Sequence, residues 1–523
     1  MQPQGLTPRQ KNWPTSAIVV TLVLALLLGL FGVLGVVGMV TIGRLNNEVE
    51  DLSNQLVAAE GRIADLEDDL ASAQRKGTVS GLEDLLGGLL GGEGATGLED
   101  LLGDLLGGGG GELGDLFGGE DPLGGLLGGL GSTDLTACLT SAPGAIEISE
   151  DDLETQIDDI AAAVSDLREL DFPSEVEPIF VSTEEMGDRV RDLAGEAMPA
   201  DVIEFDTRLW VALRMIDPSF DLVATQLDLL DSAVAGYYDP ETGDLVVATN
   251  AVDSPLGPTD QVTLAHELIH ALTDARLNFP DLIDDPRADP EPARAIQALI
   301  EGDATLGMQQ FSLGALDLMD QFGVILDPRL AASQADLEDV PYLLSNGLQL
   351  PYLEGMSFAC SLYSEGGWDA VDSAYDAPPM TTAEILFPEL YVHGFEPQTP
   401  AGARTPGEGW EELRTVGFGA VDLLNLFAAP ADHPEAALSE VRERVRSWAG
   451  GTATVWDRGT DTAVLLNLVD SGDGSPLLCD SMTEWKEVAF TGSDLANVVI
   501  DCESDAVRVG IAPGPEIASS LVG

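Results

Sequence analysis

An uncharged, apolar run at residues 16–43 constrains this chain more than any other feature. The run reads SAIVVTLVLALLLGLFGVLGVVGMVTIG and contains no acidic or basic residue. About 20 consecutive apolar residues are enough to cross a bilayer as a helix. We therefore expect an uncleaved transmembrane anchor here. A cleaved signal peptide is the alternative, although its apolar region is typically shorter and ends in a small-residue cleavage site.

The charges that flank this run predict its orientation. Arg9 and Lys11 precede it without an acidic neighbour, whereas Glu48 and other acidic residues follow soon after Arg44. Basic residues are enriched on the cytoplasmic side of membrane-spanning helices. The sequence therefore predicts a single-pass membrane protein with residues 1–15 in the cytoplasm and the rest of the chain outside the cytoplasm.

Residues 44–76 carry a heptad pattern that is typical of a coiled coil. The apolar positions, separated alternately by four and three residues, form one seam of a helix. They are Leu45, Val49, Leu52, Leu56, Ala59, Ile63, Leu66, Leu70 and Ala73. Because every copy would leave the same membrane face, we expect a parallel homo-oligomer. A lone amphipathic helix is the alternative.

Residues 77–132 are of low complexity. The stretch GLEDLLGGLL at Gly81 returns as GLEDLLGDLL at Gly97, and runs of glycine separate the leucine pairs. So much glycine makes an ordered core entropically costly. We expect a flexible Gly/Leu/Asp-rich linker that holds a globular part away from the membrane.

The charge balance argues against some classes of partner. Lysine plus arginine number 23 and aspartate plus glutamate number 91, which gives a net charge of -68 and a pI of about 4.1. Such a chain repels nucleic acid and anionic lipid headgroups. No nucleic-acid partner is therefore expected.

Four cysteines lie in the part that is expected outside the cytoplasm, where disulfides persist. None forms a close pair of the kind that binds zinc in a ribbon. A Cys479–Cys502 bridge would close a short loop, and a Cys138–Cys360 bridge would tie the start of the globular part to its middle. Four buried free thiols are the alternative.

The globular part begins near Ser132 and mixes helix and strand patterns, which predicts an α+β fold. The stretch GYYDPETGDLVVAT has the pattern of a hairpin, and a helix follows it with Thr259 or Asp260 as its cap. A helix is also expected in TEEMGDRVRDLAGEA, with Thr183 as N-cap. Nearer the C-terminus, EAALSEVRERVRSWAGG has helical spacing, and TATVWDRGTDTAVLLNLVD and NVVIDCESDAVRVGIA read as hairpins.

The stretch LAHELIH carries the chemistry. His266 and His270 are four residues apart on the expected helix, so both imidazoles project from one face at a Cβ separation of about 5–6 Å, which one zinc ion can bridge. Glu267 lies about 100° round the helix, where it reaches a water without ligating the metal. Zinc acidifies that water and polarises a carbonyl, and the glutamate takes the proton and passes it to the leaving amine. A surface helix with a histidine pair is the alternative, but the chain has only four histidines in all.

A third ligand is expected from Glu301, in ALIEGDA. It lies on a second amphipathic helix pattern, DPEPARAIQALIEGDATLGMQQF, and no third histidine follows at the short metzincin spacing. The small residues Ala298, Gly302 and Ala304 are expected to let this helix pack closely on the first. A solvated helix glutamate is the alternative.

HELIHALTDA together with ALIEGDA resembles the gluzincin group of zinc metallopeptidases, with the likeness running over residues 175–490. The resemblance implies a zincin-like domain at residues 133–395, followed by an α+β subdomain at 396–523. It implies Zn²⁺ held by His266, His270 and Glu301, with Glu267 as general base. The stretch YLEGMSFACSLYSEGGWDAVDSAYDAPPMTTAEILFPELY is similar to uncharacterised secreted prokaryotic members, which often have histidine where this chain has Phe387.

The residues that would orient the two imidazoles stay open. Asp303, and after it Asp274, are the candidates to accept an imidazole N–H and fix its tautomer. Thermolysin-like gluzincins have an aspartate where this chain has Thr305.

An oxyanion usually needs a donor besides the metal, and the tyrosines considered for it are Tyr238, Tyr363 and Tyr375. Each is also typical of a core or cleft-wall tyrosine. His393 and His433 receive no role.

The function expected from these features is a membrane-anchored, extracytoplasmic zinc metallopeptidase that acts on peptide or protein substrates. Two other interpretations stay open. One is a catalytically inactive zincin-fold binding protein, and the other is a structural surface protein that is assembled through residues 45–132.

Overall fold

The computed structural model describes residues 138, 145–149, 152–197, 199–240, 242–249, 254–279, 287–329, 337, 340–400, 404–472 and 477–523. The expected anchor (16–43), coiled coil (44–76) and linker (77–132) lie outside the described residues and stay predictions. Among the helices that are described, none is both long and apolar enough to cross a membrane.

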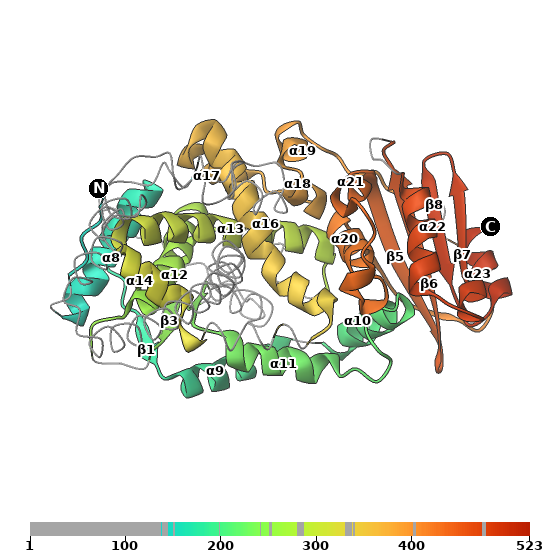
Figure 1. Cartoon of the computed structure of the whole chain (residues 1–523), viewed down its shortest axis with the longest axis horizontal. Coiled ribbons are helices and arrows are strands. Elements are labelled where there is room, and N and C mark those ends of the chain that lie inside the picture. Colours follow the sequence, from blue (N-terminus) through green and yellow to red (C-terminus); the bar gives the residue numbers. More distant parts are fainter. Residues whose placement is uncertain are drawn as a thin grey trace, which may run out of the picture. The chain divides into compact units, whose positions relative to one another are not determined.

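The described chain folds into helices and two separate sheets, an α+β arrangement (Figure 1). Its first part comprises α8 (Leu153–Arg168), β1 (Ile179–Val181), α9 (Thr183–Ala197), α10 (Ala200–Ala212), α11 (Leu222–Ala233), β2 (Gly236–Asp239), β3 (Asp244–Ala248), α12 (Pro258–Leu277), α13 (Pro290–Ala315), α14 (Leu318–Ile325), α16 (Tyr342–Gly366), α17 (Trp368–Asp376), α18 (Thr382–Leu386) and α19 (Pro388–Val392). Its second part comprises β4 (Glu411–Gly417), α20 (Ala420–Ala428), α21 (Val441–Val445), β5 (Trp448–Arg458), β6 (Asp461–Asp470), α22 (Leu478–Ala489), β7 (Val498–Glu503), β8 (Ala506–Ile511) and α23 (Pro515–Val522).

The small sheet has the strand order β1-β3-β2. Strands β2 and β3 form the antiparallel hairpin that the sequence predicts, with Tyr238 opposite Leu245, and β1 pairs with β3 in parallel. Both hairpin strands contact α12. This contact places the edge strand β2 along the helix that carries HELIH.

Helix α12 is buried along most of its length, from Thr259 to Thr273. A helix that is buried on every side belongs to the interior of a domain, and here α8, α13, β2 and β3 surround it. Its start is fixed by α8, because the side-chain amide of Gln156 bonds to both the N–H and the carbonyl of Leu256. The burial of α12 therefore excludes the alternative of a surface helix with a histidine pair.

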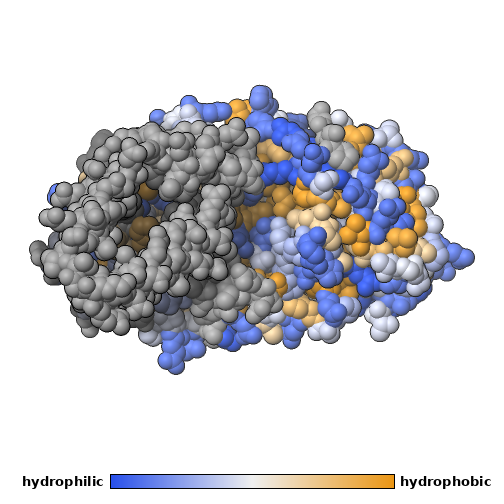
Figure 2. Space-filling view, viewed as in Figure 1, coloured by the Kyte–Doolittle hydropathy of each residue, from blue (hydrophilic) through white to orange (hydrophobic). Residues whose placement is uncertain are grey.

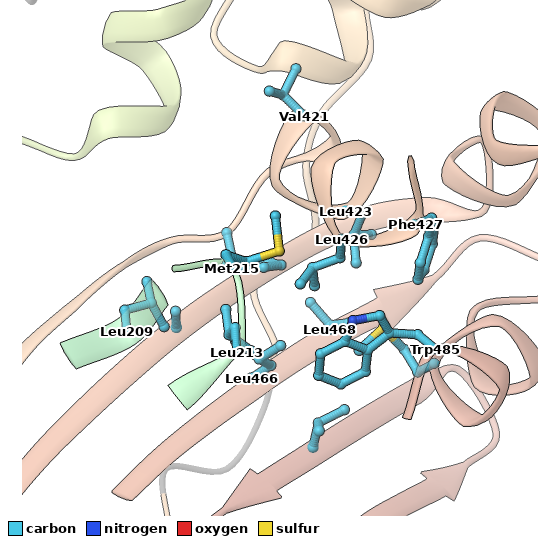
Figure 3. Packing of buried hydrophobic residues seen from close by; sticks show 14 of the residues in the cluster. Leu209, Leu213, Met215, Val421, Leu423, Leu426, Phe427, Leu466, Leu468 and Trp485 are labelled. Atoms are coloured by element: carbon cyan, nitrogen blue, oxygen red, sulfur yellow. The ribbon is translucent and has the colours of Figure 1, made fainter. Parts of the chain in front are cut away.

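The second sheet is antiparallel throughout, with the order β4-β5-β6-β8-β7. Along β6 the side chains alternate between its two faces, as the pleat requires. Leu466 and Leu468 face a large core, whereas Leu465 faces a small cluster under α23. In Figure 3, Leu423, Leu426 and Phe427 of α20 and Trp485 of α22 gather over Leu466 and Leu468.

The large core continues across the boundary at residue 395. Phe205 and Leu209 of α10, Leu350 of α16 and Leu386 of α18 belong to the same buried cluster as the sheet. Phe387 is buried in this cluster as well, beneath the guanidinium of Arg446 at 4.9 Å. On the surface over the C-terminal elements, hydrophobic and hydrophilic residues are interspersed (Figure 2).

Helices α13 and α16 lie against each other at a pair of glycines. A Cβ on Gly302 would lie 2.1 Å from the backbone of Gly355, and one on Gly355 would lie 2.1 Å from the carbonyl oxygen of Ala298. The expectation that these small residues serve close packing on α12 is therefore wrong for Ala298 and Gly302, because their partner is α16. Helix α12 is approached instead at Gly307, beside Ile269.

Two disulfides are present, Cys138–Cys360 and Cys479–Cys502. This is the expected pairing, and it excludes the alternative of four free thiols. The first bridge fastens the start of the described chain to α16, where the carbonyl of Cys138 also accepts a hydrogen bond from Gln310 of α13.

Three local expectations are wrong. Helix α12 begins at Pro258 after Gly257, so neither Thr259 nor Asp260 is its cap. Thr183 is the first residue of α9, and the hydroxyl of the preceding Ser182 accepts the N–H of Glu185. The helix expected over EAALSEVRERVRSWAGG is reduced to α21, because its last residues belong to β5.

Candidate metal centre

Helix α12 brings His266 and His270 together at its buried centre. Their Nε2 atoms are 2.9 Å apart, and their rings meet edge to face with centroids separated by 4.5 Å. Both side chains are fully buried. The i,i+4 spacing thus produces the juxtaposition that helix geometry dictates.

Glu301 of α13 completes the group. Its Oε2 lies 3.3 Å from Nε2 of His266 and 3.3 Å from Nε2 of His270. The three potential ligand atoms all lie within 4.8 Å of one another. In the described part of the chain this is the one group of histidine, cysteine or acidic residues with such convergence.

The unsatisfied polar atoms of this group test whether a metal fits. Neither carboxylate oxygen of Glu301 has a partner with hydrogen-bond geometry among the described residues, although the carboxylate is fully buried. Burying an unpaired carboxylate is costly unless a cation or a set of donors compensates it. Two imidazole nitrogens and one carboxylate are a donor set that zinc accepts. The residues therefore fit a zinc ion.

The protonation states also suit a metal. Burial, and after it the neighbouring His270, lowers the pKa of His266 to about 4, which keeps the imidazole neutral. Burial acts to raise the pKa of Glu301, but the two histidines outweigh it and the pKa is lowered overall. A neutral imidazole and an ionised carboxylate are the forms that ligate.

Glu267 lies on the side of α12 that faces the hairpin. A Cβ on Gly236 of β2 would lie 3.1 Å from Cγ of Glu267 and 3.2 Å from its Oε1, so any larger residue here would require the Glu267 side chain to shift. Burial raises the pKa of Glu267 well above its usual range, and the charge of Glu301 adds to the effect. The Tyr238 backbone N–H acts in the opposite direction on the same pKa.

Neither acid that was considered for orienting an imidazole does so. Asp303 forms a buried ion pair with Arg168 at 2.9 Å and accepts the Tyr375 hydroxyl at 2.8 Å. Asp274 accepts the hydroxyl of Tyr238 at 3.0 Å. No described residue hydrogen-bonds to Nδ1 of either histidine. The imidazoles are instead oriented by packing, with the ring of Phe279 set edge-on to His270.

The tyrosine nearest the histidines was not among the candidates. Tyr352 of α16 is buried, and its ring centroid lies 6.4 Å from that of His266. Burial raises the pKa of Tyr352 well above its usual range, followed in size by the effect of the Glu301 charge. Its hydroxyl has no well-aligned hydrogen-bond partner in the described residues. The sequence signal that could have indicated Tyr352 is Gly355, three residues later. A glycine within a helix can mark a close contact with another helix, and Gly355 contacts α13.

The other tyrosine and histidine candidates lie elsewhere. Tyr238 and Tyr375 are occupied by Asp274 and Asp303 as described above, and Tyr363 packs edge-on against Trp368. His393 and His433 are exposed and do not belong to the donor group. Thr305 lies on α13, four residues after Glu301, where its side chain is buried and its hydroxyl has no hydrogen-bond partner in the described chain.

Comparisons with protein-family models, with curated proteins and with solved structures find no match to this chain.

Proposed function

We propose that this chain is a zinc metallopeptidase with a zincin-like domain, anchored in the membrane by residues 16–43 and assembled through residues 44–76. One observation supports the chemistry above all others. Three buried donor groups from α12 and α13 converge within 4.8 Å, next to a buried glutamate that is not one of them. His266, His270 and Glu301 would hold the ion. When bound, zinc supplies a Lewis acid that polarises a carbonyl and acidifies water.

The residues of this chain supply the proton transfer. Glu267 has a raised pKa and lies against the backbone of β2. A carboxylate with a pKa nearer neutrality is suited to take a proton from the attacking water and return it to the leaving amine. The hydroxyl of Tyr352, which has no well-aligned hydrogen-bond partner among the described residues, would donate to the oxyanion that develops on the substrate carbonyl.

The metal content of the purified full-length protein tests this proposal. We expect about one zinc per chain in the wild type and a marked loss in Glu301→Ala, because a catalytic site depends on three protein ligands. Glu267→Gln should keep the zinc while peptide hydrolysis falls by roughly 10²–10⁴-fold. Absence of zinc from the wild type after incubation with Zn²⁺ would refute the proposal and leave an inactive binding or scaffold protein.

A further inference from the structure

A buried arginine close to the metal centre has no part in the chemistry proposed above. Arg168 is the last residue of α8, and its side chain is fully buried. Its Nε lies 2.9 Å from Oδ1 of Asp303, and its Nη2 lies 2.7 Å from Oδ1 of Asp372. Its Cζ lies over the ring of Trp368, 4.0 Å from the ring centroid. Burial of a charge is costly unless the charge is paired, and here carboxylates from α13 and α17 pair with it.

Arg168 reaches the place where α12 and α13 meet. A Cβ on Gly307 of α13 would lie 2.7 Å from Cδ1 of Ile269 and 3.7 Å from Cδ of Arg168. Ile269 directly precedes His270 on α12, and Gly307 follows Asp303 by about one helical turn on α13. The stem of Arg168 therefore packs on the contact between the two helices that carry the proposed ligands.

The pair of Arg168 and Asp303 also acts on the helix that presents Glu301. Glu301 and Asp303 are two residues apart on α13, so their side chains point about 200° apart around its axis. Glu301 points to the histidines of α12, and Asp303 points to the guanidinium from α8. A single short segment is thus held from two directions, which fixes the rotation of α13 about its axis at the ligand.

An aromatic path joins Asp303 to the ring of His270. The hydroxyl of Tyr375 donates to Oδ2 of Asp303 at 2.8 Å. The ring of Tyr375 stacks with that of Phe279, with centroids 6.4 Å apart and planes inclined by 19°. The ring of Phe279 in turn lies edge-on to His270 at 6.2 Å. A displacement of Asp303 would therefore reach the imidazole through two rings.

The two imidazoles depend on such packing for their orientation. In metal sites a histidine usually donates its second ring N–H to a carboxylate or carbonyl, which fixes the ring. Among the described residues, Nδ1 of His266 and Nδ1 of His270 have no such partner. The network around Arg168 lies where it can supply the missing constraint.

We propose that Arg168 is a positioning residue of the metal centre. Its guanidinium sets the rotation of α13 that presents Glu301. Through Asp303 and Tyr375 it also fixes the aromatic wall that orients His270. The inference rests on the metal centre of the proposed function and adds to it a residue from α8.

The geometry of the centre can be measured with Co²⁺ in place of zinc. The visible absorption bands of Co²⁺ depend on the arrangement of its ligands, and its affinity for the full-length protein is measured by competition with a chelator. Arg168→Lys keeps the charge but loses the planar fork and the face that lies over Trp368. We expect this variant to shift the cobalt bands and to weaken metal binding by about 10–100-fold.

Tyr375→Phe is the milder second variant. It removes one hydrogen bond from Asp303 and keeps the ring that stacks with Phe279. We expect a band shift and a smaller loss of affinity than in Arg168→Lys. Because only one hydroxyl is removed, this variant decides the question even if Arg168→Lys does not fold.

Arg444→Lys is the matched control. Arg444 of α21 is buried as well and lies 2.8 Å from Glu484, on elements that contribute nothing to the donor group. This variant should lose stability toward denaturant but keep the cobalt bands of the wild type.

The outcomes separate the inference from the proposed function. Wild-type bands and affinity in Arg168→Lys and Tyr375→Phe, or an equal shift in Arg444→Lys, would overturn the inference and leave Arg168 a purely structural residue. Shifted bands in the two network variants, with no peptide hydrolysis by the wild-type zinc protein, would keep the positioning role and refute the peptidase. A wild type that binds neither Co²⁺ nor Zn²⁺ would refute both.

Discussion

At the residue scale, the two buried glutamates of the centre show how neighbours decide the role of a side chain. Glu267 and Glu301 are both fully buried. The pKa of Glu301 is lowered overall because two imidazoles lie at 3.3 Å from its Oε2. The pKa of Glu267 is raised because burial and the charge of Glu301 are compensated only in part. The first state suits a metal ligand, and the second suits a proton carrier.

Replacing Tyr352 with phenylalanine tests the oxyanion donor. Loss of one such donor typically lowers kcat by about 10²–10³-fold, and we expect that decrease with zinc content unchanged. The thermal stability should stay equal or rise, because the hydroxyl that is removed is buried without a well-aligned partner. Steady-state kinetics and a melting curve of the same preparation check this. A Tyr352→Phe protein with wild-type kcat would exclude the role.

The juxtaposition of His266 and His270 could be predicted from sequence because their i,i+4 spacing is converted into proximity by one rigid helix. Tyr352 could not be predicted, since it lies on another helix whose facing side is decided by tertiary contacts. The prediction for Asp303 failed for a related reason. Its partner is Arg168 from α8, and nothing near Asp303 in the sequence indicates a buried arginine far upstream.

At the element scale, the crossing of α13 and α16 positions both Glu301 and Tyr352. The contact point is Gly302 against Gly355, with no space for a Cβ on either. Gly302 follows Glu301 directly, and Gly355 is one turn from Tyr352. A separation of these helices would therefore shift the proposed metal ligand Glu301 and the proposed oxyanion donor Tyr352 together.

Gly302→Ala and Gly355→Ala should each lower the free energy of unfolding by about 1–3 kcal/mol through overpacking. Both should also weaken zinc retention. Gly347→Ala on α16 is the matched control, since a Cβ there meets nothing within 4 Å and alanine favours a helix by about 0.5–1 kcal/mol. Denaturant titration and zinc content are the measurements. If all three variants behave alike, the glycine contact does not support the site.

The first turn of α13 contains a buried acid that predicts a pH dependence. The carboxylate of Glu291 accepts the N–H and hydroxyl of Thr382 at 2.7 and 2.8 Å. Burial, and then the charge of Asp422, raises the pKa of Glu291 to about 8, while Arg294 acts in the opposite direction. The folded protein therefore binds a proton that the unfolded chain has released at pH values between about 4.5 and 8. Stability must fall as the pH rises through this window.

Glu291→Gln keeps the acceptor for Thr382 and removes the titration. We expect the wild type to lose stability, on the order of a few kcal/mol, between pH 5 and 9 relative to the variant. The two proteins should differ least near pH 5. Chemical denaturation of both at each pH measures the difference, and parallel stability profiles would contradict the assignment.

At the scale of the whole molecule, local sequence patterns predicted individual strands correctly, whereas the expected domain boundary is crossed by the hydrophobic core. Both C-terminal hairpins form where the alternation of apolar residues places them, because strand pairing depends mainly on neighbours in the sequence. A domain boundary at residue 395 was expected, with a separate α+β subdomain after it. The core nevertheless joins α10 and α16 to the five-stranded sheet, since apolar faces far apart in the sequence cover one another, and a one-dimensional pattern does not show that pairing.

The two disulfides allow a prediction on this scale because they close loops of very different length. Cys138 and Cys360 are 222 residues apart, and Cys479 and Cys502 are 23 residues apart. A cross-link restricts the unfolded chain more when its loop is longer, and the loop-entropy relation gives about 5 kcal/mol for the first and about 3 kcal/mol for the second. Replacing both cysteines of a pair with serine should therefore cost about 2 kcal/mol more for the longer loop. Denaturant unfolding of the two double variants measures this difference, and an equal loss would mean that native-state contacts rather than loop closure determine the contribution of Cys138–Cys360.

The longer bridge also ends on α16, two turns beyond Tyr352, so its loss should lower zinc retention, whereas loss of Cys479–Cys502 should not.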